Sequence, residues 1–564
     1  MDLSRRDTIR AGAALAAAAA VSRIVAPSLA QAAVSASTTL TTTYGPGPAN
    51  PQGYRKIVGL PGEPRIVRTD LGVAAGAGRA STREALLSFV QLSDVHVVDH
   101  QSPGRLEWVD RIETTGLFSS SYRPQEMLTA QVADAMVQAV NAQASGPVTG
   151  LPFTFVIETG DNSDNCQYNE IRWNIGILDG GTIRSDSGAL AKYEGVADNN
   201  KTYYDVHYWH PDAVPAGKQP DIYKADHGFP TVPGLLDAAR RPFTAPGLDV
   251  PWYTCFGNHD GLMQGNFPHT VPTSLLGVGS LKVISPPTGL SDTDIKDALA
   301  SQDVNKLIGH LTVSPSVRLV RADYKRRTVT RKQIVDEHFH TTGAPVGHGF
   351  TSENRKKGTA YYYFDQGKFR HVVMDTVNPN GYDDGSLDSG QFTWLKKTVE
   401  AATGKAVIVY SHHTVDTMTN PLVGTGGDLS PRVLGGDVAS YLLTQPRVIA
   451  WVNGHTHKNQ IFVHSRGDGS GGFWEINTAS HCDYPQQARI IEITDNHDGT
   501  LSIFTTILNH AGPADYAGDL SNTLALASLS RELSVNDPQA NLAAASGTLS
   551  ARNTELLVGT PADF

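Results

Sequence analysis

The chain has 564 residues, enough for one large domain with insertions or for two to four ordinary domains. Hydrophobic residues make up 40% of it and charged residues 18%, which is typical of a folded protein with a core and excludes a disordered chain. The net charge is −10, so the composition gives no support for a nucleic-acid partner or for binding to an anionic membrane.

Residues 1–32 have the layout of an export signal. Arg5 and Arg6 precede an apolar, alanine-rich run at 11–21, and the small residues at 30–32 provide an A-x-A cleavage site. The paired arginines resemble the twin-arginine type of signal. We therefore expect the twin-arginine export machinery to be a partner of the precursor, and a periplasmic or extracellular location; an amphipathic N-terminal helix is the alternative. No other apolar run of about 18 residues predicts a transmembrane anchor.

The first half of the chain mixes predicted elements with long irregular segments. Residues 33–84 are rich in Thr, Ser, Pro and Gly, which indicates a surface-bound or poorly ordered lead-in. Apolar spacing then predicts, in order, a strand at 85–92, a helix at 124–142, a strand at 153–157 and a short strand at 252–256.

Two long segments, at about 165–250 and 261–358, interrupt this pattern. Segments of this length in an α/β protein usually build the rim or lid of an active site, and decorative insertion is the alternative. The first contains a group of aromatic residues that either line a substrate pocket or simply pack in a core: Tyr203, Tyr204, Tyr208 and Trp209.

The second half predicts alternating strands and helices. Strands are expected at 360–364, 369–375, 406–410, 448–452, 472–477, 488–494 and 501–508. A helix is expected at 391–401, with Ser389 as its N-cap. Such alternation indicates an α/β protein whose sheet faces are covered. The tail at 511–564 has no motif that indicates a function.

The three cysteines are Cys166, Cys255 and Cys482. An odd number excludes a fully paired set of intramolecular disulfides. One disulfide and three buried free thiols are both compatible with this count.

Five predicted strand ends carry side chains that can bind metal ions. They are Asp94-x-His96, Gly160-Asp161, Gly257-Asn258-His259-Asp260, Ser411-His412-His413 and Gly454-His455-Thr456-His457. Each motif alone is a weak signal, because an isolated histidine is more often a hydrogen-bonded core or surface residue. In open α/β sheets, sites form beyond the carboxyl ends of the strands, so five such ends predict one shared crevice.

The set D-x-H, G-D-x-x-D, G-N-H-D, H-H and G-H-x-H resembles the calcineurin-like metallophosphoesterase superfamily. The resemblance runs from about residue 88 to 507, with the two long segments as insertions. Within the superfamily the chain resembles exported bacterial metallophosphoesterases, whose motifs are similar to VVDHQSP at 97–103 and DYPQQARI at 483–490. The resemblance implies an α/β fold, a four-layer α/β/β/α sandwich, with its domain at 85–510.

The resemblance also implies two metal ions. One would be held by Asp94, His96, Asp161 and His457, and the second by Asp161, Asn258, His412 and His455. Carboxylate, amide and imidazole ligands suit Fe, Mn, Zn or Co. Two such ions lower the pKa of a bridging water and clamp the phosphoryl oxygens. His413 stays an alternative to His412, because Thr414 replaces the proline usual after this pair.

His259 is implied to be a catalytic residue that faces the leaving-group oxygen as a general acid or charge stabiliser. Asp164 falls where phosphoprotein phosphatases have the carboxylate that orients this histidine, and a role in the turn is the alternative. Those enzymes have an arginine next, where this chain has Asn165, so a diester or a lipid- or nucleotide-derived substrate is favoured unless an arginine from one of the insertions substitutes. Purple acid phosphatases place a metal-binding tyrosine at the position of Asp164. Asp260 is expected to cap the turn.

We therefore predict an exported dinuclear-metal phosphoesterase that hydrolyses a phosphate mono- or diester by attack of a metal-bridging hydroxide. Two alternatives stay open: a metal-stabilised binding protein with an occluded site, and a metallohydrolase of a non-phosphate bond. The presence of His259 beside the ligand residues favours an enzyme, because a purely structural metal site does not need it. The sequence leaves open the substrate, the metal identities and the oligomeric state.

Overall fold

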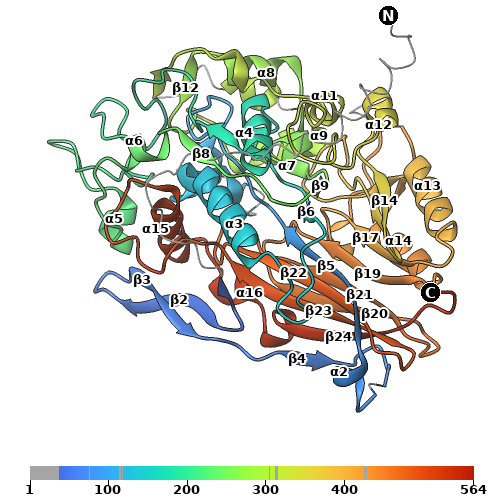
Figure 1. The fold of residues 1–564 in the computed structure, drawn as a ribbon. Coiled ribbons are helices and arrows are strands. Elements are labelled where there is room, and N and C mark those ends of the chain that lie inside the picture. The colour runs from blue at the N-terminus through green and yellow to red at the C-terminus, as the bar shows by residue number, and fades with distance from the viewer. Residues whose placement is uncertain are drawn as a thin grey trace, which may run out of the picture. The chain divides into compact units, whose positions relative to one another are not determined.

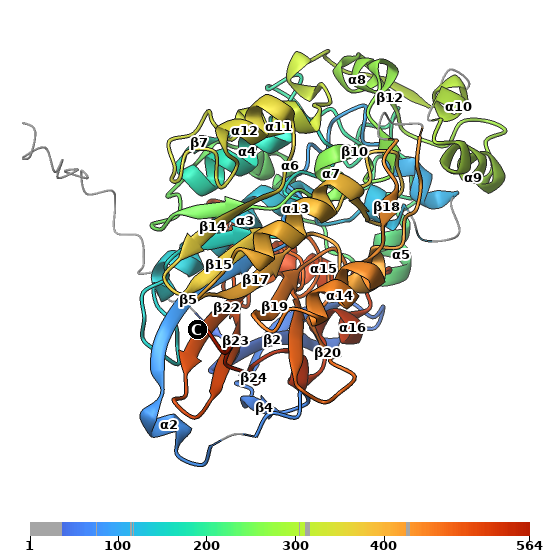
Figure 2. The same cartoon turned by 90° about the vertical axis from the view of Figure 1, so that its right-hand side faces the viewer.

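The computed structural model describes residues 37–74, 76–112, 116, 118–303, 305–310, 316–424 and 429–564. The predicted export signal at 1–32 lies outside the described residues. From Ser35 to Phe564 the chain forms one unit, built on two mixed β-sheets (Figures 1 and 2). No helix in the described part of the chain has the length and apolar content needed to cross a bilayer.

The first sheet contains strands from both ends of the chain. In spatial order it consists of β4 (Ile66–Arg68), β24 (Thr554–Gly559), β23 (Thr500–Asn509), β22 (Gln487–Asp495), β5 (Glu84–Leu92), β6 (Val156–Glu158) and β9 (Trp252–Thr254), and β1 (Ser37–Thr38) pairs with β23. The strands β5, β6 and β9 run parallel to one another. Their carboxyl ends therefore lie at the same edge of the sheet.

The second sheet has six strands. In spatial order these are β14 (Tyr362–Gln366), β15 (Phe369–Val373), β17 (Ala406–Tyr410), β19 (Val448–Asn453), β21 (Gly472–Asn477) and β20 (Gln460–Ser465). The four central strands are parallel, and the two outer ones are antiparallel to their neighbours. The strands predicted at 406–410 and 472–477 have the bounds of β17 and β21.

Helices cover the outer faces of both sheets (Figure 2). The helices α3 (Thr129–Gln143) and α4 (Tyr168–Asp179) bury apolar side chains against the first sheet. The helices α13 (Ser389–Glu400) and α14 (Gly435–Leu443) do the same for the second. The predicted α/β fold with four layers is thus confirmed. The N-cap of α13 is Asp388, whose carboxylate accepts the Gln391 N–H, and not Ser389 as predicted.

Successive side chains of a strand point to opposite faces of its sheet, so each central strand contributes to the core on both of its faces. In β17, Ile408 and Tyr410 point into the core between the two sheets, whereas Val407 and Val409 point into the core under α13 and α14. A strand buried on both faces reads as a continuous apolar run, which is why AVIVY was recognisable as a central parallel strand.

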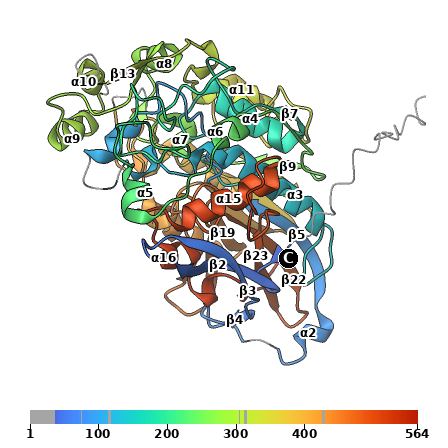
Figure 3. The same ribbon diagram turned by 90° about the vertical axis from the view of Figure 1, so that its left-hand side faces the viewer.

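Both predicted flanking segments, at 33–84 and 511–564, contribute to the first sheet, which therefore extends beyond the predicted 85–510 domain. The first supplies β1 and β4 to that sheet, and it also forms a separate hairpin of β2 (Thr42–Ala49) with β3 (Arg55–Pro61). The second supplies β24 and helix α15 (Thr523–Val535), which lies between α3 and this hairpin (Figures 1 and 3).

The two predicted insertions contain short helices and hairpins. The first holds α4, β7 (Gly181–Ile183), α5 (Ile222–His227), α6 (Leu235–Ala239) and β8 (Phe243–Ala245). The short helix α7 (Asn258–Gly261) leads into the second, which holds β10 (Leu262–Met263), β11 (Phe267–Pro268), α8 (Val271–Val278), β12 (Leu281–Val283), α9 (Asp292–Ser301), α10 (Asn305–Ile308), β13 (Val317–Leu319), α11 (Arg331–Glu337) and α12 (Ser352–Lys357). Tyr208 and Trp209 are buried in an apolar cluster with Phe229, which indicates packing and not substrate binding.

His371 on β15 is a titratable residue buried in the core between the two sheets. Its ring stacks on Phe364 at 4.6 Å between centroids, and its Nδ1 lies 2.9 Å from the Tyr410 hydroxyl. Its Nε2 has no hydrogen-bond partner among the described residues. Burial lowers the pKa of His371 to about 3, so the side chain is neutral in the folded protein near neutral pH.

We predict that His371→Phe reduces the loss of stability in acid. In the unfolded chain the imidazole of His371 takes up a proton at about pH 6.5, whereas in the folded chain it does so only at about pH 3. Folded stability therefore falls as the pH drops through this window, by up to about 1.4 kcal/mol per pH unit. Urea unfolding at pH 7, 6 and 5 should show the variant gaining roughly 2 kcal/mol on the wild type between pH 7 and 5. A constant difference across that range would contradict the assignment.

Candidate functional site

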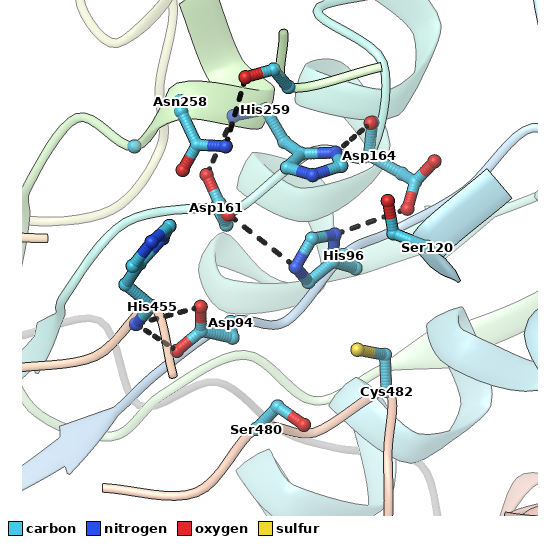
Figure 4. Close-up of polar contacts among 12 residues, drawn as sticks. Asp94, His96, Ser120, Asp161, Asp164, Asn258, His259, His455, Ser480 and Cys482 are labelled. Carbon is cyan, nitrogen blue, oxygen red and sulfur yellow. Dashed lines mark hydrogen bonds and ion pairs between the residues drawn. The ribbon is translucent and has the colours of Figure 1, made fainter. Parts of the chain in front are cut away.

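The predicted site residues gather at the edge where the carboxyl ends of the parallel strands of both sheets meet. The motifs follow β5, β6, β9, β17 and β19. Seven of the predicted residues are almost fully buried: Asp94, His96, Asp161, Asp164, Asn258, His259 and His412. His455 and His457 are partly exposed at the mouth of the group. Figure 4 shows most of them converging on one small volume.

The backbone at this edge adopts a conformation that is rare for residues with side chains. Five of the predicted ligand residues have positive φ angles: Asp94 at 49°, His96 at 46°, Asp161 at 52°, His455 at 71° and His457 at 57°. A residue other than glycine in this left-handed region costs roughly 1–2 kcal/mol. Such strain persists where the surrounding structure imposes it, and it clusters at functional sites.

Two of the motif glycines allow close approach at these turns. A Cβ atom on Gly257 would lie 2.2 Å from the Asp161 backbone nitrogen. A Cβ atom on Gly454 would lie 2.0 Å from Ser93 Oγ and 2.5 Å from Asp94 Oδ2. Both glycines are therefore required so that the neighbouring strand ends can place their carboxylates side by side.

Three of the predicted ligand imidazoles are held through their Nδ1 atoms. The contacts are His96 Nδ1 with Asp164 Oδ1 at 3.1 Å, His412 Nδ1 with the Thr159 carbonyl at 2.9 Å, and His457 Nδ1 with Asp483 Oδ2 at 2.7 Å. Carbonyl and carboxylate oxygens only accept hydrogen bonds, so each Nδ1 donates. In the neutral imidazole, Nε2 is then left with a lone pair. This arrangement is typical of histidines that bind metal ions.

The Nε2 lone pair of His412 faces other acceptors. It lies 2.9 Å from Asn258 Oδ1, 3.2 Å from Asp161 Oδ2 and 3.2 Å from His455 Nδ1. Burial lowers the pKa of His412, but the neighbouring Asp161 carboxylate more than offsets this and raises it to about 9. The position therefore attracts a positive charge, either a proton or a metal ion.

A second group of ligand atoms adjoins the first through Asp161. His96 Nε2 is buried without a hydrogen-bond partner among the described residues and lies 3.6 Å from Asp161 Oδ2. His457 Nε2 lies 3.3 Å from Asp94 Oδ1. Carboxylate and imidazole donors at these spacings, with Asp161 shared between the two groups, fit the two predicted metal positions.

The structure distinguishes between the two adjacent histidines His412 and His413. His413 Nδ1 accepts from the Thr376 hydroxyl at 2.7 Å, and His413 Nε2 donates to the Asp383 carbonyl at 2.7 Å. Both of its ring nitrogens are therefore occupied by protein groups. This favours His412 over His413 as the ligand.

The structure assigns the carboxylate of Asp164 a different contact from the predicted one. His259 Nδ1 donates to the backbone carbonyl of Asp164 at 2.6 Å. The Asp164 carboxylate instead contacts His96 and forms an ion pair with the Arg105 guanidinium (Figure 4 shows the contacts to His96 and His259). The reason is the buried cation of Arg105, which draws the carboxylate away from His259. Asp164 thus positions His259 through its backbone.

Asp260 has the turn-capping role expected from the sequence. Its carboxylate accepts the backbone N–H of Gly257 at 2.9 Å, of Ser163 at 2.9 Å and of Asn162 at 3.1 Å. It therefore ties the loop after β9 to the loop after β6, and with them Asn258 to Asp161.

A cavity of about 250 Å³ opens beside these groups. Its walls include Arg123, Asp161, Asn258, His259, Asp383, His455, His457 and Asp483. Arg123 is buried, and its Nε lies 2.7 Å from Asp483 Oδ1. Sequence reasoning did not single out Arg105, Arg123 or Asp383. Asp483 alone carried a signal, as the first residue of the DYPQQARI stretch.

The three cysteines are free and buried. Cys482 Sγ lies 4.0 Å from His457 Nδ1, which already donates to Asp483. Burial raises the pKa of the Cys482 thiol. A neutral thiol is a poor metal ligand, so the structure favours imidazole and carboxylate ligands at this edge.

We predict that His412→Ala lowers the metal content of the protein, whereas His413→Gln leaves it unchanged. The first change removes an Nε2 lone pair that faces Asp161, and the second affects a ring whose nitrogens are bonded to Thr376 and Asp383. Elemental analysis of the purified variants measures the outcome. The opposite result, metal loss only in His413→Gln, would show that the two histidines exchange roles.

The sequence profile of the family described as calcineurin-like phosphoesterase matches residues 225–459. The match includes Asn258, His259, His412, His455 and His457. None of the curated proteins compared with the chain matches it.

Two solved structures are similar to the chain at low identity. A dimetal phosphatase from Danio rerio is 12% identical, with 76% of this chain and 100% of that chain covered and a TM-score of 0.30. The purple acid phosphatase PPD1 from yellow lupin (Lupinus luteus) seeds is 10% identical, with 80% and 55% covered and a TM-score of 0.29. The fold assignment therefore depends on the strand topology of the chain and on the family match.

Proposed function

We propose that the chain is a metal-dependent phosphoester hydrolase of the calcineurin-like phosphoesterase family, whose profile matches residues 225–459. We propose further that it uses two metal ions to hydrolyse a phosphate mono- or diester outside the cytoplasm. The proposal of export rests on the signal-like layout of residues 1–32. The proposal of two metal ions rests on the geometry at the strand ends.

One observation carries the two-metal proposal. Three imidazoles, those of the buried His96 and His412 and the partly exposed His457, donate their Nδ1 hydrogens to fixed protein acceptors and direct Nε2 at the carboxylates of Asp94 and Asp161. Lone pairs that face each other in a buried space repel unless a cation lies between them. Bound Mn, Fe, Zn or Co ions would polarise the phosphoryl oxygens and lower the pKa of the attacking water.

His259 is placed to assist the leaving group. Its Nδ1 donates to the Asp164 carbonyl at 2.6 Å, and its backbone N–H donates to Asp161 Oδ1 at 2.8 Å. The ring is therefore held against the metal-binding edge, and Nε2 is the nitrogen left for a ligand in the cavity that His259 lines. A protonated Nε2 can donate to the leaving-group oxygen as the ester bond breaks.

Arg123 is placed to bind the phosphoryl group in the role of the arginine that phosphoprotein phosphatases have after Asp164. It lines the same cavity, and two carboxylates orient it: Asp483 at 2.7 Å and Asp164 at 3.7 Å. A guanidinium held in this way keeps further N–H groups for the oxygens of a phosphate. It comes from the loop before α3 and not from either insertion.

The alternative of a binding protein with an occluded site is less well supported. The cavity of about 250 Å³ is lined by His259 and Arg123 as well as by ligand residues, so a substrate can contact them. No contact in the described site specifically favours a carbonyl substrate over a phosphate ester.

We predict that Asp161→Ala and Asn258→Ala abolish metal-dependent turnover of chromogenic phosphate mono- and diesters. His259→Ala should instead keep its metal ions and slow turnover by roughly 10²-fold or more, most for poor leaving groups. The surface variant His497→Gln is the matched control and should keep wild-type rates. Unchanged turnover in Asp161→Ala would show that the site is wrongly assigned, and normal rates in His259→Ala would exclude the acid role.

A further inference from the structure

The C-terminal segment 511–564 forms one wall of a second cavity beside the metal-binding edge. This wall consists of the end of α15, the loop 536–541 and α16 (Leu542–Ser546). The Ala545 carbonyl accepts the Asn459 N–H at 3.0 Å, which ties α16 to the loop that carries His457. Asn536 exchanges two hydrogen bonds of 2.7 Å with the backbone of Arg55 on β3. The tail is therefore fixed in place against the site.

The second cavity has a volume of about 290 Å³ and adjoins the first. Five residues line both cavities: Ser119, Arg123, Thr456, His457 and Asp483. A phosphate ester whose phosphoryl group lies at the metal-binding edge can therefore extend its leaving group into the space bounded by the tail. A volume of this size admits a small alcohol or a sugar.

Two ionisable side chains of the second cavity, those of Lys458 and Asp537, keep hydrogen-bonding capacity that the described protein groups do not use. Arg123 and Asp483 form an ion pair with each other at 2.7 Å. Lys458, in contrast, directly follows His457, and its ammonium has no hydrogen-bond or ion-pair partner among the described residues. Asp537, in the tail loop, accepts only the Gln539 N–H, through Oδ1 at 3.0 Å. Its other carboxylate oxygen is free of protein partners in the described part of the chain.

Polar and ionisable groups that line a cavity without protein partners need water or a ligand to satisfy them. An ammonium only donates hydrogen bonds and a carboxylate only accepts them. A hydroxyl group does both, so a ligand with several hydroxyl groups can satisfy Lys458 and Asp537 together. An alkyl group of the same size would leave both side chains without hydrogen-bond partners.

We infer that the second cavity is a leaving-group subsite for a polyhydroxylated alcohol, with Lys458 and Asp537 as its specificity-determining residues. The inference rests on the proposed function, because it takes the phosphoryl group to lie at the metal-binding edge. It assigns the tail a role in substrate selection, and Lys458 and Asp537 act by binding the leaving group and not on the reacting atoms.

The test compares glycerol phosphate with n-propyl phosphate, and the methyl diesters of both, on the metal-loaded full-length protein. The two alcohols differ only in hydroxyl groups. We expect kcat/KM of the wild type to favour the glycerol ester by about 10-fold or more, since a hydrogen bond to a charged group discriminates by at least this much. Lys458→Met and Asp537→Asn should each reduce this ratio by about 10-fold, mainly through KM. Lys356→Met on α12 is the matched control and should retain the wild-type ratio.

The ratio of kcat/KM for the two esters distinguishes a loss of leaving-group binding from general damage to the site. A misfolded variant, or one that has lost its metal ions, slows the turnover of both esters together and leaves their ratio unchanged. A wild-type ratio near unity or an unchanged ratio in both cavity variants would overturn the inference. Serine phosphate is compared as well, because its ammonium and carboxylate can pair with Asp537 and Lys458, and a preference for it over glycerol phosphate would also overturn the inference. Turnover of neither series by the metal-loaded wild type would instead contradict the proposed function itself.

Discussion

The structure of the site depends on hydrogen bonds that fix three imidazole rings through Nδ1, the ring nitrogen that faces away from the candidate metal positions. Thr159, Asp164 and Asp483 each accept an Nδ1–H, and this fixes the Nε2 lone pairs toward the carboxylates of Asp94 and Asp161. Without these acceptors the rings could turn or change tautomer, and the repulsion between acceptors would be relieved without a cation. With them in place, the charge balance of the buried edge requires positive charge at the two positions shared through Asp161.

The two sheets make this arrangement possible. Parallel strands direct their carboxyl ends to one edge, so residues as far apart in the chain as 94 and 457 meet there. The turns that follow are too tight for ordinary backbone geometry, and the positive φ angles of five ligand residues are the result. The extensive cores between and outside the sheets stabilise the fold enough to maintain such strained turns.

Sequence reasoning located the candidate metal-binding edge because its signals are local. Each motif combines an apolar run with polar residues directly after it, as in AVIVYSHH at 406–413. Contacts between distant segments had no such signal. The pairing of Arg105 with Asp164 decides which atom of Asp164 meets His259, and nothing near residue 105 indicates it. The strand β24 was missed for the same reason, since its six residues form a strand by pairing with β23 and β4, which are distant in the sequence.

The metal content of the purified protein tests the account most directly. After incubation with Mn, Zn, Fe or Co and removal of free ions, elemental analysis should show about two bound ions per chain, as a two-metal site requires. Asp161→Ala, which removes the carboxylate shared by both positions, should fall well below this value. Saturation of the wild type at one ion or none, or an Asp161→Ala variant that binds as many ions as the wild type, would contradict a two-metal centre at this edge.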